Sequence, residues 1–172
     1  MHEKRLANLL GAASLALSDL MLTQVREAGR VSASGAAALV VLAYTPGLSV
    51  TELGRRIGLS QPATARMVDS LETSGLVQRG QKAGRTVSVE LTTAGRRTVR
   101  EVRATRDTQM GSLLAGLDPD DRAQLERLLE VLLTRLYNDV GSSDLLCRLC
   151  DRSCCTDGAI CPVGQAERDQ RR

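Results

Sequence analysis

Aromatic side chains are nearly absent from this chain of 172 residues, which has no Trp, no Phe and only two tyrosines, Tyr44 and Tyr137. Its core must therefore be aliphatic, and stacking of bases on aromatic rings is an unfavourable way for it to bind nucleic acid. Histidine is equally scarce, since His2 is the only one, and the sequence has neither a phosphate-binding glycine loop nor a Ser/His/Asp set. Without these groups for proton transfer and nucleophilic attack, we expect that the protein is not an enzyme.

Long apolar runs are missing as well. No uninterrupted apolar stretch reaches the ~18 residues of a membrane span, which argues against a membrane protein. Apolar residues from Leu6 to Met21 recur at helical spacing and lead without a break into charged residues, as in an amphipathic helix rather than a signal peptide. We therefore expect one cytoplasmic domain with a small appendage, in which the five cysteines are thiols or metal ligands rather than disulfides.

Charge is unevenly distributed along the chain, although the formal net charge is only +3. Residues 1–54 are neutral overall, residues 55–106 carry 11 basic and 4 acidic groups, and residues 107–172 carry 8 basic and 12 acidic groups. The middle segment therefore has a net charge of +7 between a neutral and an acidic end. This pattern is consistent with a polyanionic partner, and a solvated basic face without a partner would look the same.

Periodicity and capping residues predict six helices, with Ser34 and Ser60 as the N-caps of the second and the fourth. The first four span about residues 3–28, 34–43, 51–57 and 60–71, the fifth is Arg-rich and begins at Thr92 or Thr93, and the sixth is Leu-rich and begins at Asp118. Between the fourth and the fifth, β-branched residues at Leu76–Val77 and Thr86–Leu91 predict a hairpin of two strands with a basic tip.

The order of helix, turn, helix and hairpin over Ser49–Leu91 is that of a winged helix-turn-helix. In such a fold the helix at 51–57 lies across the phosphate backbone, and the first turns of the helix at 60–71 enter the major groove. Side chains at these places can pair with phosphates or base edges. The expected DNA contacts are Thr51, Ser60, Gln61, Pro62, Thr64 and Arg66 in the helices and Arg79, Lys82 and Arg85 in the hairpin. For any one of these residues taken alone, an exposed side chain that does not contact DNA is the simpler interpretation.

Two stretches resemble the signature of the MarR (multiple antibiotic resistance regulator) family: Ser49–Arg79 (SVTELGRRIGLSQPATARMVDSLETSGLVQR) and Val87–Arg96 (VSVELTTAGR). The resemblance extends over about residues 1–140. It implies a mainly helical winged helix-turn-helix fold with a small β-hairpin wing, which dimerises through its N- and C-terminal helices. It further implies a homodimer that binds a palindromic operator in double-stranded DNA, usually as a repressor, until a small-molecule effector or an oxidant intervenes.

One departure from the family pattern lies at the tip of the hairpin. Wings of the family often carry an aspartate-rich tip before an arginine, whereas Gly80–Arg85 contains no acidic residue. An arginine braced by an aspartate is therefore not expected here. The sequence predicts a looser wing that contacts phosphates less selectively.

The expected organisation has four parts. Residues 1–31 form an N-terminal dimerisation helix, residues 32–96 the DNA-binding lobe, residues 97–141 the C-terminal dimerisation helices, and residues 142–172 a cysteine-rich appendage with a polar tail. The first and sixth helices carry more apolar surface than the small winged core can cover. That excess favours a dimer interface over one larger monomeric core.

All five cysteines fall within 15 residues near the C-terminus: Cys147, Cys150, Cys154, Cys155 and Cys161. A Cys-x-x-Cys pair completed by two further thiolates would form a closed zinc site. The ending Cys161–Pro162 also suits an iron–sulfur cluster. Arg148 and Arg152 would lower the pKa of neighbouring thiols, as a thiol–disulfide switch requires. These three alternatives stay open, as does the choice of ligand within the adjacent pair at 154 and 155.

The sequence thus predicts a cytoplasmic, dimeric, DNA-binding transcription regulator whose cysteine appendage responds to metal or redox state. One alternative is a protein-interaction module that kept the winged fold and no longer binds DNA. Another is a thiol oxidoreductase that uses Cys147 and Cys150, although the strand–helix setting of such enzymes is missing.

Overall fold

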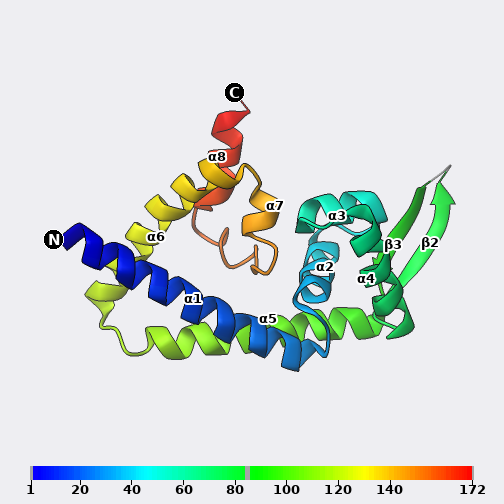
Figure 1. The fold of residues 1–172 in the computed structure, drawn as a ribbon, viewed down its shortest axis with the longest axis horizontal. Coiled ribbons are helices and arrows are strands. Elements are labelled where there is room, and N and C mark those ends of the chain that lie inside the picture. The colour runs from blue at the N-terminus through cyan, green and yellow to red at the C-terminus, as the bar shows by residue number, and fades with distance from the viewer. Residues whose placement is uncertain (1, 84–85, 172) are drawn as a thin grey trace.

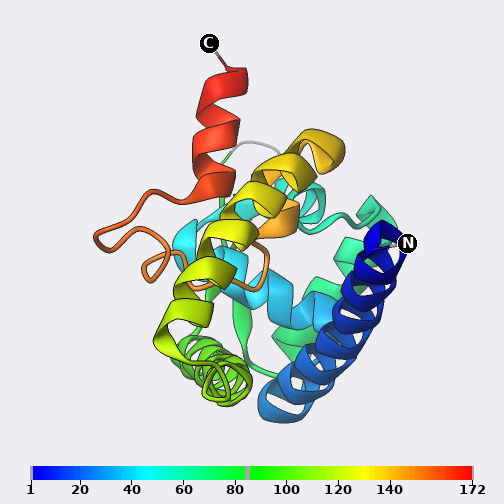
Figure 2. The ribbon, with the colours of Figure 1, turned by 90° about the vertical axis from the view of Figure 1, so that its left-hand side faces the viewer.

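The computed structural model describes residues 2–83 and 86–171, and it is mainly helical with one small antiparallel sheet. In chain order the elements are α1 (His2–Gly29), α2 (Ala33–Tyr44), β1 (Leu48–Ser49), α3 (Val50–Ile57), α4 (Gln61–Thr73), β2 (Val77–Ala83), β3 (Thr86–Leu91), α5 (Thr93–Leu114), α6 (Pro119–Val140), α7 (Ser143–Leu146) and α8 (Pro162–Gln170). Figure 1 shows α1 and α5 side by side along one edge, with a lobe of α2, α3, α4 and the sheet at one end of α5. Figure 2 shows α8 projecting at the far end of α6.

Local sequence signals set the helix ends. Ser49 caps α3 through its hydroxyl, and Gly58 ends the same helix in the left-handed conformation (φ 73°) that glycine adopts without steric cost. The N-cap of α2 differs from the expectation, because it is Ser32 rather than Ser34 whose hydroxyl accepts the amide of Gly35 at 3.0 Å. The first helix of the helix-turn-helix therefore begins and ends where the sequence predicts, and α2 begins slightly earlier than expected.

The sheet has three strands rather than the two expected. β2 and β3 form the predicted hairpin, and β1 adds a third antiparallel strand in which Leu48 lies opposite Val89. A strand of two residues is too short to show an alternating pattern, so the sequence carries no signal for it. Because β1 leads directly into α3, this pairing ties the helix-turn-helix to the base of the wing.

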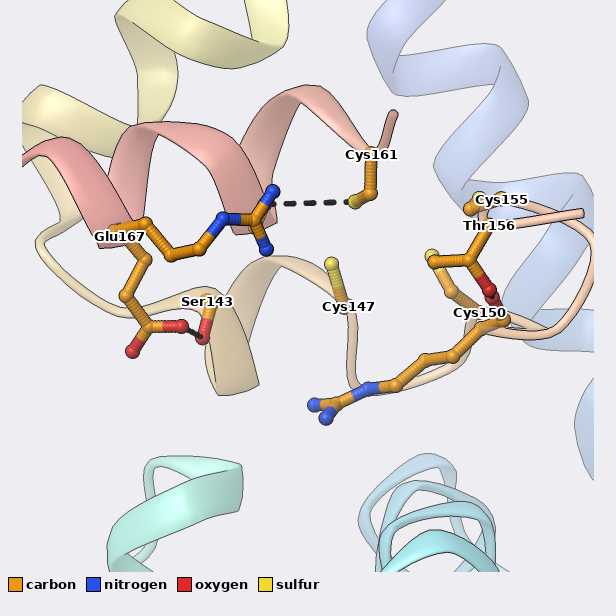
Figure 3. A pocket seen from close by; sticks show the side chains of 10 residues that line it. Ser143, Cys147, Cys150, Cys155, Thr156, Cys161 and Glu167 are labelled. Carbon is orange, nitrogen blue, oxygen red and sulfur yellow. Dashed lines mark hydrogen bonds between the residues drawn. The ribbon is translucent and has the colours of Figure 1, made fainter. Parts of the chain in front are cut away.

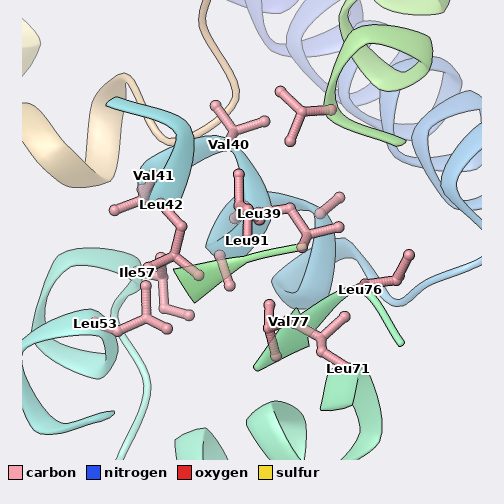
Figure 4. Close-up of a cluster of buried hydrophobic side chains, with 14 of the residues drawn as sticks. Leu39, Val40, Val41, Leu42, Leu53, Ile57, Leu71, Leu76, Val77 and Leu91 are labelled. Atoms are coloured by element: carbon pink, nitrogen blue, oxygen red, sulfur yellow. The ribbon is translucent and has the colours of Figure 1, made fainter. Parts of the chain in front are cut away.

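Helix α2 is the centre of the lobe, and all its residues from Ala36 to Leu42 are buried. Leu53 and Ile57 of α3, Val68 and Leu71 of α4, and the inner faces of β2 and β3 pack around it, as Figure 4 shows for most of these side chains. Their spacing in the sequence predicts a small core beneath the helix-turn-helix, with Leu59 as its fifth member, and Leu59 is only partly buried against that core. The core is aliphatic, as the scarcity of aromatic residues requires.

Helices α1 and α6 leave large apolar side chains uncovered. Leu6 is 67% exposed and Leu15 is 70% exposed. The other exposed aliphatic residues of the two helices are Leu9, Leu10, Leu17, Leu20, Leu128, Leu129, Val131, Leu136 and Val140. By length and hydropathy alone the stretch Glu3–Gly29 could also cross a membrane, so the exclusion drawn from run length is too strong. The core helix of a soluble protein and a signal sequence meet the same criteria of length and hydropathy.

Candidate nucleic-acid interface and cysteine pocket

The turn between α3 and α4 presents the leading end of α4 to solvent. Gln61, Pro62 and Arg66 are exposed, as are Ser60 at the N-cap position and Thr51 in the first turn of α3. The opposite face of α4 is anchored in the core, so the exposed side is held at a fixed angle on the lobe. Unlike the other caps, the Ser60 side chain makes no hydrogen bond to the first turn of its helix. These five predicted residues are therefore all accessible to solvent at the starts of α3 and α4.

Thr64 does not belong to this surface, and the prediction that it contacts DNA is wrong. Its side chain is fully buried, and its hydroxyl donates to the carbonyl of Ser60 at 2.9 Å. It packs against Gly54 of α3, where an added Cβ would collide with the Thr64 hydroxyl. The spacing of Thr64 with Val68 and Leu71 places it on the core face of α4, a signal that the sequence contains.

Arg79 in β2 is held by two acidic side chains of α4. Its guanidinium donates to Asp69 at 2.5 Å and also to Glu72. The hydrogen bond to Asp69 raises the pKa of Arg79. The expectation that no arginine of the wing is braced by an aspartate is therefore wrong, because the aspartate comes from α4 rather than from the tip. Of the other predicted wing contacts, Arg85 and the Lys82 side chain lie outside the described residues.

The first turn of α3 forms an ion-pair cluster that extends to α7. Glu52 accepts hydrogen bonds from Arg55 at 2.7 Å and from Arg56 at 2.9 Å, and these bonds lower the pKa of Glu52 to about 2. Both guanidinium groups also lie 3.8 Å from a carboxylate oxygen of Asp144 in α7. Leu145, the next residue, contacts the turn at Gly58. The chain that leads to the cysteines therefore touches the helix-turn-helix directly.

A second contact centres on Tyr44 at the end of α2. Its hydroxyl lies 2.9 Å from a carboxylate oxygen of Asp151 and accepts the amide of Arg152 at 2.5 Å. The Arg103 guanidinium of α5 lies over the ring, 4.4 Å from its centre. Burial raises the pKa of Tyr44. Leu149 is buried in the same core as α2, so the cysteine segment is packed onto the lobe. Sequence reasoning missed these contacts, because their partners are more than 100 residues apart.

Four of the five cysteines line one pocket of about 160 Å³. Cys147 follows α7, Cys150 lies one turn later, Cys155 belongs to the following loop, and Cys161 caps α8 (Figure 3). Arg152 and Arg168 also line the pocket, and the Gly164 amide donates to the Cys161 sulfur at 3.5 Å. Cys154 is exposed and does not line this pocket. The pocket therefore distinguishes Cys155, which lines it, from Cys154, which does not. The sequence alone does not distinguish these two neighbours.

The thiols differ in acidity. A hydrogen bond from Cys147 lowers the pKa of Cys150 to about 6, and nearby guanidinium groups, foremost that of Arg106, act in the same direction against the effect of burial. The same hydrogen bond, together with burial, raises the pKa of Cys147. Of these two thiols, Cys150 therefore ionises more readily than Cys147.

The expected tetrathiolate zinc site does not have a preformed geometry. Within residues 2–83 and 86–171, no three His, Cys, Asp or Glu side chains converge closely enough to hold one metal ion. Four thiolates around one zinc ion must approach each other to roughly 3.8 Å, since each Zn–S bond is about 2.3 Å.

Comparison with known proteins identifies the lobe. The model of the MarR family matches residues 31–85, which include α2, the helix-turn-helix and the first strand of the wing hairpin. This match assigns the lobe at residues 31–85 to the MarR family. The family consists of transcription regulators rather than enzymes, and the sequence resemblance and the expected fold class are confirmed.

The relatives of this chain agree with the assignment of its lobe. It is 26% identical over 114 residues to YdgJ, an HTH-type transcriptional regulator of Bacillus subtilis, with 65% of this chain and 67% of YdgJ covered. The crystal structure of YusO from Bacillus subtilis superposes with a TM-score of 0.68 at 24% identity, covering 76% of this chain and 93% of YusO. A variant of MepR from Staphylococcus aureus bound to an oligodeoxyribonucleotide gives a TM-score of 0.59 at 19% identity, covering 76% and 96%. These structures show that the fold is shared.

Proposed function

We propose that this protein is a sequence-specific repressor that binds a palindromic operator as a homodimer in the cytoplasm and responds to metal or redox state through its C-terminal cysteines. The observation that carries the proposal is the exposed leading end of α4, with Gln61, Pro62 and Arg66 on a helix whose other face is fixed in the core. A rigid helix that presents side chains of these types has the geometry needed to read a major groove. The DNA-bound relative of the same fold supports this use of the lobe.

Each side chain at this surface has a chemically suitable partner on duplex DNA. Gln61 pairs with an adenine edge, Arg66 with the two acceptors of a guanine, and Pro62 contacts a thymine methyl group. Thr51 and Ser60 bind phosphates beside the ends of α3 and α4. Lys82 and Arg85 at the wing contact the backbone or the minor groove. Arg79 is better suited to hold the wing against α4, because Asp69 and Glu72 already engage its guanidinium.

A second copy of the chain covers the exposed apolar faces of α1 and α6. Leu6 and Leu15 on α1, together with Leu128, Leu136 and Val140 on α6, are between 42% and 70% exposed in the single chain. Residues 1–31 and 97–141 therefore supply the dimer interface, and residues 32–96 supply the reading lobe. Two α4 helices related by a two-fold axis would meet successive major grooves, about 34 Å apart.

The cysteine segment, residues 142–172, has a physical path to the lobe. Asp144 joins it to the arginines of α3, and Asp151 joins it to Tyr44 of α2. A change of metal content or thiol oxidation that moves these contacts would alter the position of α3 and so the fit of α4 to DNA. Such an effect requires that the two states of the segment contact the lobe differently.

The test uses the full-length protein and operator sequences selected from a random duplex pool. Arg66→Ala should relax the base preference at one position in each half-site and weaken binding by about 1–3 kcal/mol. Arg171→Ala is the matched control, because Arg171 is an exposed arginine at the end of α8, outside the lobe and outside the proposed dimer helices. Wild-type affinity should also fall steeply as salt rises, because bound cations leave the DNA. An Arg66→Ala variant with unchanged preference and affinity would contradict the proposed reading surface.

A further inference from the structure

Cys147 and Cys150 are brought together by a single turn of the backbone. The chain leaves α7 at Cys147, and the amide of Cys150 donates to the carbonyl of Cys147 at 3.0 Å. A turn closed by such a bond keeps the Cα atoms at its two ends within about 7 Å, the distance beyond which a disulfide requires the backbone to move. The two thiols also share a hydrogen bond. The two sulfurs therefore lie next to each other on a turn that a disulfide can span.

The hollow of about 160 Å³ beside these thiols gives a small oxidant access to them. Cys147 and Cys150 both line it and are both partly exposed. Cys155 and Cys161 line the same hollow, as Figure 3 shows, but the thiol that is hydrogen-bonded to Cys150 belongs to Cys147. Cys147 is therefore the thiol best placed to react with an oxidised Cys150.

The surroundings of the two thiols give them different reactivity. The hydrogen bond from Cys147 favours the thiolate form of Cys150, and guanidinium groups around it, foremost that of Arg106, act in the same direction. The thiolate, rather than the thiol, is the nucleophile in reactions of cysteine with oxidants. Cys150 is therefore the thiol that reacts first, and Cys147 is the resolving thiol.

We propose that a hydroperoxide oxidises Cys150 and that Cys147 then closes an intrachain disulfide with it. In the first step the Cys150 sulfur attacks one peroxide oxygen, the O–O bond breaks, and the leaving oxygen takes up a proton as water or an alcohol. In the second step the Cys147 sulfur attacks the resulting sulfenic acid, an S–S bond replaces the S–O bond, and the oxygen leaves as water with the proton of Cys147. The two thiols lose two electrons, and the hydroperoxide gains them.

The disulfide would enclose Leu149, which the segment buries in the core of the lobe. Leu149 lies between the two cysteines and is 6% exposed, and Asp151, directly after Cys150, contacts Tyr44 of α2. A covalent ring across this turn restricts the backbone that carries both contacts. The assignment deepens the proposed redox response, and only this effect on the lobe rests on the proposed function.

Peptide mapping assigns the disulfide directly, because arginines separate the cysteines. Full-length protein is purified without oxygen, treated with hydrogen peroxide, alkylated, unfolded and cut with trypsin without reduction. Trypsin cleaves after arginine, so Cys147 falls in peptide 136–148, Cys150 in 149–152, and the other three cysteines in 153–168. We expect 149–152 linked to 136–148. Linkage of 149–152 to 153–168 would overturn the proposal, and so would a peptide 149–152 that stays unlinked, including in protein whose thiols a bound metal ion protects.

Serine variants distinguish the attacking thiol from the resolving thiol. Cys147→Ser should leave Cys150 as a sulfenic acid, which dimedone traps and mass spectrometry detects. Cys150→Ser should slow thiol loss under peroxide roughly tenfold, because an ordinary thiol is mostly protonated at neutral pH. Cys154→Ser is the matched control, because Cys154 is exposed and does not line the pocket, and it should form the disulfide at the wild-type rate.

Circular dichroism checks that the three variants keep the helix content of the wild type. Wild-type oxidation kinetics in Cys150→Ser would contradict the role of Cys150. Sulfenic acid on another cysteine in Cys147→Ser would contradict it as well. Peptide mapping of the wild type tests the disulfide even if a variant does not fold.

DNA affinity measured on reduced and oxidised samples separates this inference from the proposed function. A disulfide that forms and changes the affinity supports the modification site and its sensing role. A disulfide that forms without changing the affinity supports the site and contradicts the sensing role. Protein that forms the disulfide and binds no duplex in either state contradicts the proposed function and leaves the modification site in place.

Discussion

The winged lobe and the cysteine segment are held together in different ways. In the lobe, α2 is buried from Ala36 to Leu42, and α1, α3, α4, α5 and β3 pack aliphatic side chains against it. The cysteine segment contributes one residue to that core, Leu149, and meets the lobe elsewhere through Leu145 at Gly58 and through the polar contacts of Asp144 and Asp151. Non-directional burial fixes the lobe, whereas a few directional contacts position the segment.

This difference suits the roles proposed for the two regions. A surface that reads DNA must keep its side chains at fixed angles, and a continuous core provides that rigidity. A segment that reports metal or redox state must change its contacts at small energetic cost, and few-contact regions open most easily.

Truncating one core leucine in each region should give the largest contrast. Leu53→Ala removes a fully buried side chain of the lobe and should lower the free energy of unfolding by about 2–5 kcal/mol. Leu149→Ala truncates a residue that is 6% exposed and should mainly increase hydrogen exchange over residues 142–171. Thermal unfolding and exchange mass spectrometry check the pair. Equal global destabilisation by the two variants would mean that the segment is as integral to the fold as the lobe.

Removing one hydroxyl tests the polar docking of the segment. Tyr44→Phe deletes the group that contacts Asp151 and accepts the Arg152 amide. Loss of these bonds should weaken docking by about 1 kcal/mol, which accelerates exchange of the 150–153 amides roughly fivefold. The control is Tyr137→Phe, which removes the same hydroxyl from the other tyrosine. Tyr137 belongs to α6 and packs against α8, away from this contact. Unchanged exchange in Tyr44→Phe would show that the Tyr44 hydroxyl does not hold the segment on the lobe.

The two regions also differ in how far sequence alone predicts them. Local signals predicted the helix-turn-helix, because caps, glycines and apolar spacing act over a few residues; the same spacing could have assigned Thr64 to the core. The pairing of β1, the Arg79–Asp69 brace and the docking of Tyr44 join residues that no local pattern connects. The number and spacing of the cysteines predicted a metal or redox site near the C-terminus. Only the fold separates Cys154 from the four cysteines that line the pocket.

Substitution of Arg79, which pairs with Asp69 and Glu72 of α4, should have a smaller effect. It tests whether Arg79 holds the wing against α4 or contacts DNA directly. Arg79→Ala should reduce stability and DNA affinity each by less than about 1 kcal/mol, because the ion pairs are partly exposed. The salt dependence of binding should stay unchanged, since Asp69 and Glu72 already neutralise this charge. Lys82→Ala is the comparison, and it should reduce the salt slope by about 1 if Lys82 contacts a phosphate. A reduced slope in Arg79→Ala would instead indicate a direct phosphate contact.

The smallest expected effect is a pH dependence of the α3 ion-pair cluster. Hydrogen bonds from Arg55 and Arg56 lower the pKa of Glu52 to about 2 in the folded chain, below its usual value near 4.5. The carboxylate therefore stabilises the fold fully above about pH 4.5, and this contribution is lost as the pH falls through 2. Glu52→Gln should lower the stability by less than about 1 kcal/mol at pH 7, because the group is partly exposed, and the difference from wild type should vanish at pH 2. Glu101→Gln, which removes a carboxylate paired with a single arginine on α5, is the control for loss of one surface charge. A Glu52→Gln difference that stays constant from pH 7 to pH 2 would place its origin outside this cluster.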